Sequence, residues 1–363
     1  MSQPPSQYTD WPIDWPTEDQ GAEPEDRLPA VTAVETDRLW VHLMWELVLL
    51  AAVVGVGLLL LDGDRDALSG GRLEQLLTQA AGIGMVAAGL ACSLRAAAPN
   101  LAVGAVFGTS TVALGWLQVE DDRSLASAVP AVLLAAALTG LLLAGFVVVL
   151  HVPAWAASLG FVPLLLAATI GLAEERRRDV PMLGDQPRLL FALFVLASVL
   201  GGVLCAFPAF RRWFGGLRGQ RDPGRRAGAA AATATTLALV VSTVLAALGG
   251  MVVDLAADPE GVGQQLGLAG LDATLLALGA VLVGGVSAFG RRGGIFGTVL
   301  GVALVVLLLE LARRELDLES RPASTLYLAV PGGLILAGLV VNRMLEATGR
   351  RTVLVEETVT AAG

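Results

Sequence analysis

The chain has 363 residues, of which 55% are hydrophobic and only 16% are charged, and its mean hydropathy is +0.70. Because soluble domains carry about 25% charged residues, this composition excludes an ordinary water-soluble globular protein. It predicts an all-α, polytopic membrane bundle, since apolar segments of about 20 residues can cross the hydrocarbon layer as helices.

The first 39 residues differ from the rest of the chain. They contain nine acidic residues and two arginines, so they hold −7 of the net charge of −9. We expect residues 1–39 to be a disordered acidic cytoplasmic tail, because they have little apolar surface to bury. They lack the basic start and apolar core of a signal peptide. A repeated Asp-Trp-Pro, at 10–12 and 14–16, reflects either compositional bias or a short docking motif or interfacial anchor.

Ten apolar stretches follow the tail. They cover roughly residues 40–61, 75–94, 101–118, 126–150, 155–173, 188–207, 231–253, 270–288, 295–312 and 326–344. Pro99 and Asn100 interrupt the second and third stretches, which are therefore two helices or a helix with a re-entrant segment. The runs lack the alternation of barrel strands. We therefore predict a transmembrane permease-like domain over residues 40–345 and a short cytoplasmic tail over 346–363.

The distribution of arginine favours a cytoplasmic N-terminus. The chain contains no lysine, and with ten spans its most basic loop, residues 210–228, falls on the cytoplasmic side. The cluster at 176–178 opposes this orientation, so the preference depends on the larger loop. The arginine-rich and alanine-rich composition is typical of a GC-rich bacterial genome, and we expect the protein in a bacterial plasma membrane.

The sequence lacks the residue types that several kinds of catalysis and metal binding require. Without lysine there is no phosphate-binding Gly-Lys-Ser/Thr loop and no Schiff base. The two histidines, His42 and His151, are too few and too far apart for a histidine metal cage. Cys92 and Cys205 lie within apolar stretches, as packed thiols do. We therefore expect no catalytic residues, no metal, no cofactor and no enzymatic activity.

Few ionisable residues fall within the apolar stretches. His42 and Glu46 share a helix face and are either a proton-linked pair or side chains close enough to the interface to stay hydrated. Asp254, Asp272 and Glu310 are expected to border loops. Because no chain of buried carboxylates is evident, we expect a partner to supply the energy for any uphill transport.

The segment 284–301 reads GGVSAFGRRGGIFGTVLG. Gly293, Gly297 and Gly301 recur at intervals of four, so they lie on one helix face and allow another helix to approach closely. The preceding glycines permit a tight turn, and the two arginines mark its water-facing side. The predicted packing glycines are Gly284, Gly285, Gly290, Gly293, Gly297 and Gly301.

The same segment resembles the late motif of permease subunits of ribose-type and branched-chain-type ABC transporters, here as a divergent member. The matching residues are Gly284, Gly285, Ser287, Gly290, Gly293, Ile295, Gly297, Thr298 and Gly301. Residues 153–160, PAWAASLG, resemble the family's Pro-x-Phe-Ile-Val-Thr-Leu-Gly. Residues 100–104, NLAVG, are similar to its Asp-Leu-Ser-Val-Gly, with Asn100 and Ala102 as departures. The three matches come in family order over most of residues 75–345.

The resemblance implies two paired permease subunits, as a homo- or heterodimer, of about ten helices each. It also implies a separate ATP-binding subunit at the cytoplasmic loops, an extracytoplasmic solute-binding protein and a small polar, sugar-like solute. Nucleic acid is not an expected partner. The candidate pathway residues are Asn100, Thr109, Ser110 and Ser158, unless these polar groups are only bonded within helices. The candidate ATPase-facing residues are Arg221, Arg225 and Arg226, unless their loop is a plain positive-inside loop.

Two other functions remain open. A self-contained secondary metabolite carrier would have two related halves, and no half-to-half repeat is evident in the sequence. A non-transporting membrane scaffold would have no aqueous path and would depend on its acidic tail. The departures at Asn100 and Ala102 are compatible with altered substrate contacts or with a degenerate partner of a more typical permease.

Overall fold

The computed structural model describes residues 31–37, 39–119, 121, 123–174, 186–207, 228–256, 270–288, 295–315 and 324–356. It divides into two compact units. One contains residues 38–349, and the other contains residues 1–37 together with residues 350–363.

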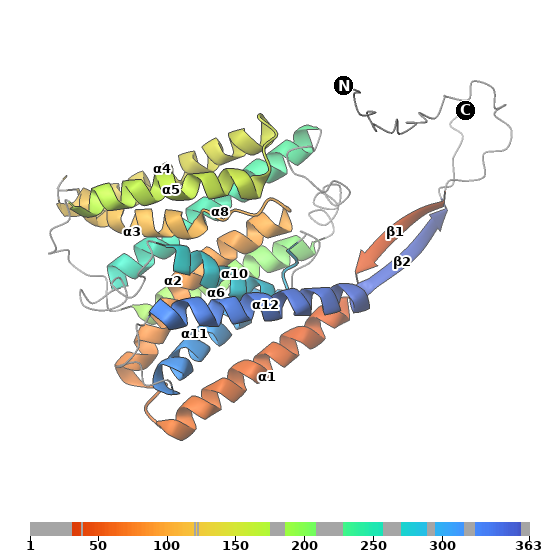
Figure 1. The fold of residues 1–363 in the computed structure, drawn as a ribbon, viewed down its shortest axis with the longest axis horizontal. Helices are drawn as coiled ribbons and strands as arrows, with labels where there is room; N and C mark the ends of the chain where they lie inside the picture. The colour runs from red at the N-terminus through yellow and green to blue at the C-terminus, as the bar shows by residue number, and fades with distance from the viewer. Residues whose placement is uncertain are drawn as a thin grey trace, which may run out of the picture. The chain divides into compact units, whose positions relative to one another are not determined.

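The larger unit is helical (Figure 1). Ten helices fall within its described residues: α1 (Leu39–Gly63), α2 (Gly70–Arg95), α3 (Val103–Val119), α4 (Leu125–Val148), α5 (Ala154–Glu174), α6 (Pro187–Ala206), α8 (Ala229–Ala256), α10 (Leu271–Val283), α11 (Gly297–Glu315) and α12 (Ser324–Gly349). Each corresponds to one of the ten predicted apolar stretches. Seven of them are long and apolar enough to cross a membrane. The predicted polytopic helical bundle is therefore confirmed.

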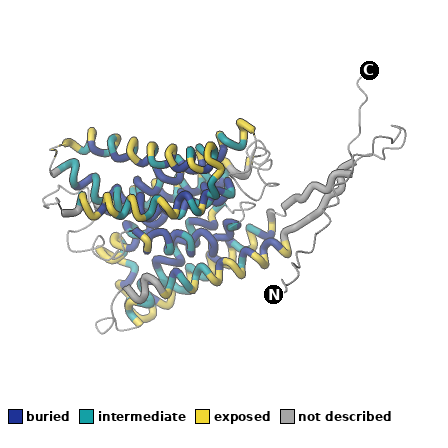
Figure 2. The backbone as a smooth tube through the Cα atoms, turned by 45° about the horizontal axis from the view of Figure 1, so that its top comes forward, coloured by how far each residue is buried: buried dark blue, intermediate teal, exposed yellow. Residues whose placement is uncertain are grey.

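Many large side chains face outward and many small ones face inward in these helices, although several leucines are also fully buried. In α4, Leu134, Leu138 and Leu141 are exposed, whereas Ala136 and Gly140 are buried. A soluble helix shows the reverse pattern. Lipid is as apolar as leucine, so leucine side chains gain nothing by facing inward, and close contact between small residues holds the helices together. Buried residues concentrate in the middle of the unit, and exposed residues line its outer surface (Figure 2).

The helices pack in a repeated pattern. At the centre, α2 and α8 pack against each other over much of their length. On one side α3 contacts α5 and α8, and α4 contacts α8; on the other side α10 contacts α12 and α2, and α11 contacts α2. The two groups of helices, α2–α5 and α8–α12, therefore have corresponding contacts. In these contacts α2 corresponds to α8, α3 to α10, α4 to α11 and α5 to α12. The apolar sequence pattern did not reveal this repeat.

Two of the helices are short. Residues 96–102 separate α2 from α3, so the region around Pro99 forms two helices. The 13 residues of α10 rise about 20 Å, which is less than the hydrocarbon thickness of about 30 Å. The starts of α3 and α10 are largely covered by protein, since Ala102, Val103 and Ala273 are at most 1% exposed, although Leu271 is 44% exposed. Non-helical backbone at membrane depth requires such protein cover.

The smaller unit contains a two-stranded antiparallel ribbon. Strand β1 (Val31–Asp37) pairs with β2 (Arg350–Glu356), from Val31 opposite Glu356 to Asp37 opposite Arg350. Both strands lie in segments that the sequence analysis assigned to terminal tails. Their β-branched residues suit a strand, but pairing between the two ends of a chain leaves no local signal. The rest of the acidic tail, residues 1–30, lies outside the described residues.

Candidate functional site

The start of α3 lies directly against the start of α10. A Cβ atom added at Gly104 would lie 1.8 Å from the carbonyl oxygen of Gly270, and one added at Gly270 would lie 1.9 Å from that of Gly104. Gly270 also has a φ of +96°, a conformation that favours glycine. We call this region the junction, defined as residues 96–104 and 270–274. Only glycine lets the two backbones meet there.

Asn100 connects three helices at the junction. Its side-chain Nδ2 donates to the Ser242 hydroxyl of α8 at 3.2 Å, and its Oδ1 accepts from the backbone N–H of Ala102 at 3.1 Å. Its own backbone N–H donates to the Ser93 hydroxyl of α2 at 3.2 Å. The residue is fully buried. Asn100 therefore satisfies polar groups that the helix break would otherwise leave unpaired.

Two further hydroxyls complete the junction. Ser158 of α5 accepts from the backbone N–H of Leu101 at 3.0 Å. Thr274 of α10 accepts from the backbone N–H of Gly104 at 3.0 Å and donates to the carbonyl oxygen of Leu101 at 3.4 Å. Ala97 has a left-handed φ of +50°, which costs an L-residue about 1–2 kcal/mol. The break is thus a strained backbone held by side chains from neighbouring helices.

The junction offers hydrogen-bonding groups and two helix N-termini. The N-terminal end of a helix carries a partial positive charge, and Asp272 lies in the first turn of α10 with only 3% exposure. The prediction that Asp272 lies near a span end agrees with its place in the first turn of α10, and its side chain is buried there. No group of His, Cys, Asp or Glu among the described residues could hold a metal ion. The side chains gathered at the junction are amide and hydroxyl groups together with the carboxyl group of Asp272.

Thr109 and Ser110 lie farther along α3. The Thr109 hydroxyl lies 2.9 Å from that of Thr169 on α5, and Ser110 donates to the carbonyl oxygen of Ala247 on α8 at 3.1 Å. The structure therefore brings Asn100 and Ser158 together at the junction, whereas Thr109 and Ser110 face the same neighbouring helices from the next turns. All four hydrogen-bond within the protein in this conformation, and their role in a pathway stays a prediction.

The glycines of the late motif hold α10 and α11 close together. A Cβ atom added at Gly284 would lie 2.5 Å from the carbonyl oxygen of Gly297, and one at Gly301 would lie 2.1 Å from that of Ala280. Gly285 has a φ of +81°. Gly290 and Gly293 lie outside the described residues, as do the arginines of the predicted ATPase-facing loop, Arg221, Arg225 and Arg226.

Glu46 has a role that the sequence analysis did not consider. Its carboxylate accepts hydrogen bonds from the backbone N–H groups of Phe296 at 2.9 Å and Gly297 at 3.1 Å, where α11 begins. It is 7% exposed, so the interpretation that it lies in water at the interface is wrong. The contact joins residues 250 positions apart, and no local pattern in the sequence indicates it.

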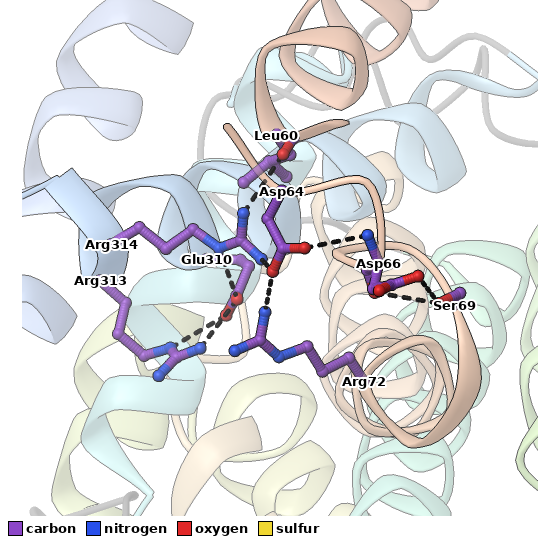
Figure 3. A network of polar contacts seen from close by, with 8 residues as sticks. All are labelled: Leu60, Asp64, Asp66, Ser69, Arg72, Glu310, Arg313 and Arg314. Atoms are coloured by element: carbon purple, nitrogen blue, oxygen red, sulfur yellow. Dashed lines mark hydrogen bonds and ion pairs between the residues drawn. The ribbon is translucent and has the colours of Figure 1, made fainter. Parts of the chain in front are cut away.

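A polar network joins the far end of α1 to α11 (Figure 3). Asp64 pairs with Arg72 at 2.6 Å and with Arg314 at 3.2 Å, and Arg314 also donates to the carbonyl oxygen of Leu60 at 3.2 Å. Arg313 and Arg314 both pair with Glu310. The backbone N–H of Asp66, helped by the two arginines, holds the pKa of Asp64 below its ordinary value of 3.8.

The family of the chain is shown by a match to a known protein-family model. The model is described as "Branched-chain amino acid transport system / permease component" and matches residues 72–339, which include the junction and the late motif but not α1. No curated protein and no solved structure matches the chain. The match extends over well more than half of the 363 residues. The chain therefore belongs to the permease components of branched-chain-type ABC transport systems.

Proposed function

We propose that this chain is the transmembrane subunit of an ABC transporter that moves a small polar, sugar-like solute across the bacterial plasma membrane. A separate ATP-binding subunit would drive the transport, and a second permease subunit and an extracytoplasmic solute-binding protein would complete the complex. The observation that carries this proposal is the family match over residues 72–339, which enclose two helices that begin at one buried polar junction.

The junction supports a polar solute of modest size. Asn100, Ser158 and Thr274 provide amide and hydroxyl groups that already accept hydrogen bonds from backbone N–H groups of residues 101–104. These groups suit the hydroxyls of a sugar, because each can donate and accept. Alternating access would separate the two helix starts and exchange the internal hydrogen bonds for bonds to the solute.

A branched-chain amino acid is the second candidate solute. It is favoured by the description of the matching family and by the two helix N-termini at the junction, since such ends stabilise a carboxylate. At neutral pH a sugar carries no ionised group, whereas a branched-chain amino acid is a zwitterion with no net charge. The two solute classes are distinguished by competition: sugars of different stereochemistry should compete for uptake in one case, and leucine, isoleucine and valine in the other.

The proposal is tested by reconstitution. The full chain is expressed with a candidate ATPase subunit and binding protein and purified in mild detergent. The complex is then placed in liposomes, with ATP on the side of the membrane that the ATPase subunit faces. We expect the ATPase to co-purify and labelled solute to accumulate only with hydrolysable ATP. A hydrolysis-deficient ATPase subunit is the matched control. Loss of the ATPase on purification, together with no ATP-dependent uptake, would contradict the proposal.

The repeated packing of α2–α5 and α8–α12 is compatible with the alternative of a self-contained carrier, because such a carrier is expected to have two related halves. Uptake by the chain alone, driven by an ion gradient and unaffected by ATP, would favour that alternative. A scaffold would show neither form of uptake and would lose its partners when residues 1–39 are removed.

A further inference from the structure

Two adjacent side chains of α1 contact the end of α10 and the start of α11. We call these two helices, which the late motif connects, the late-motif hairpin. Trp45 donates its indole N–H to the carbonyl oxygen of Val283, the last residue of α10, at 2.8 Å. Glu46 accepts from Phe296 and Gly297, where α11 begins. Because α1 precedes the matched residues 72–339, these contacts come from outside the region that identifies the family.

Glu46 has a clear physical reason to lie in a predominantly apolar helix. The first N–H groups of a helix have no partner within the helix, and the positive end of the helix dipole attracts a carboxylate. Hydrogen bonds to a charged acceptor are also stronger than neutral ones. Glu46 supplies all three effects to α11 from a neighbouring helix.

Trp45 acts on the other side of the same hairpin. A Cβ atom added at Gly285 would lie 3.2 Å from Trp45 Cδ1 and 3.4 Å from Leu345 Cδ1. The indole ring therefore lies beside the left-handed turn that ends α10. The carbonyl groups that end a helix also lack partners within it, and the Trp45 N–H provides one.

The helix that carries these two residues is itself fixed to α11. At the far end, Arg314 of α11 donates to the carbonyl oxygen of Leu60 and pairs with Asp64. Between the two ends, Leu49 packs in a buried cluster with Val283 and Leu304. Helix α1 is thus attached to α11 at both ends and along its middle.

Helix α10 connects the hairpin to the junction. It begins against Gly104 and ends at Val283 after 13 residues. Because a helix this short is rigid, a displacement of its C-terminal end at the hairpin also displaces its N-terminal end at the junction. We infer that Trp45 and Glu46 are positioning residues that set the spacing of the ends of α10 and α11, and so the turnover of the transporter. This inference rests on the proposed function for its effect on turnover, but not for the geometry of the hairpin.

The test uses the full reconstituted complex with Glu46→Ala, Glu46→Gln and Trp45→Phe. Controls are Glu74→Gln, which changes an exposed carboxylate of α2, and Trp40→Phe, which changes an exposed indole of α1. We expect Glu46→Ala to accelerate hydrogen exchange of the Phe296 and Gly297 amides about tenfold or more. Glu46→Gln should give a smaller effect, because its amide oxygen remains a neutral acceptor.

In transport assays we expect Glu46→Ala and Trp45→Phe to lower the maximal rate roughly fivefold with little change in KM. The controls should resemble the unchanged protein in both assays. A merely structural role would instead lower the unfolding temperature and slow transport together, with faster exchange throughout the bundle.

Unchanged exchange at 296–297 in Glu46→Ala, or a KM that rises as the rate falls, would overturn the inference. If Glu46→Ala does not fold, Glu46→Gln and Trp45→Phe decide the question by the same readouts. If the unchanged complex shows no ATP-dependent uptake, the proposed function has failed, while the exchange result still decides whether Glu46 positions the hairpin.

Discussion

At the scale of single residues, the junction depends on a few polar groups and glycines whose partners include residues far away in the sequence. Asn100 is bonded to side chains of α2 and α8 and to its own helix start. Removal of one member of such a buried set leaves its partners unsatisfied, which costs more than the bond itself contributes.

Asn100→Ala should therefore lower the free energy of unfolding by about 1–3 kcal/mol. Asn100→Asp should cost less, because its carboxylate still accepts from Ala102 and the Ser242 hydroxyl can rotate to donate to it. Thermal unfolding of the two variants in the same detergent checks this order. Equal stability of Asn100→Ala and the unchanged protein would contradict the role of Asn100 as a connector.

Gly104→Ala should separate the starts of α3 and α10, because the new methyl group would overlap the backbone of Gly270. We expect a loss of about 1–3 kcal/mol in the free energy of unfolding. Gly160→Ala on α5 is the matched control, since nothing lies within 4 Å of a Cβ atom there. Unfolding curves that place both variants at the same midpoint would show that the close approach is not required.

At the scale of elements, the loop between α1 and α2 is held by charge. Asp64 accepts from the backbone N–H of Asp66 and pairs with Arg72 and Arg314. A carboxyl group whose pKa is lowered on folding stabilises the folded state above its unfolded pKa. That contribution is lost as the pH falls through the folded pKa.

Because the folded pKa of Asp64 lies below its ordinary value of 3.8, the loop should become mobile only as the pH falls below 3.8 and Asp64 becomes protonated. A nitroxide spin label at residue 71, an exposed position with open space around it in the first turn of α2 and next to Arg72, would report this change in its electron paramagnetic resonance spectrum. Asp64→Asn should be mobile at every pH, and Asp62→Asn should keep the transition. A transition that persists in Asp64→Asn would assign it to another group.

At the scale of the whole helical unit, the bundle has two distinct ends. Trp45 near the start of α1 and Leu345 near the end of α12 both lie beside Gly285. Leu60 and Asp64 at the end of α1 lie instead beside Arg314 at the end of α11. The start of α1 and the end of α12 therefore lie at the same end of the bundle, which fits the ten crossings predicted from the sequence.

Cysteine labelling tests the predicted orientation in whole cells. With Cys92 and Cys205 replaced by alanine, Asp66→Cys should react with an impermeant maleimide added outside, because its loop follows the first crossing. Ala347→Cys, at the end of α12, should react only after the membrane is permeabilised. The reverse pattern would place the N-terminus outside and would remove the basis for cytoplasmic ATPase contacts at residues 210–228.

The amino-acid sequence by itself determined the positions of the ten apolar helices that the described residues form. An apolar run of membrane length can satisfy its backbone in lipid only as a helix, so the ten stretches and the break at Pro99 could be predicted from local composition. The late motif also indicated the family and the close packing of glycines, because a spacing of four residues on one helix is a local property.

Only the tertiary structure decided which helices meet and through which groups. A helix that is apolar on every side has no periodic apolar face from which its neighbour could be predicted. The repeated packing around α2 and α8 therefore could not be predicted from the sequence pattern. The contacts of Gly104 with Gly270 and of Glu46 with Gly297 join residues far apart in the chain. Their partners are set by the three-dimensional fit of small residues and by the need to satisfy buried polar groups, and neither is written in the order of neighbouring residues.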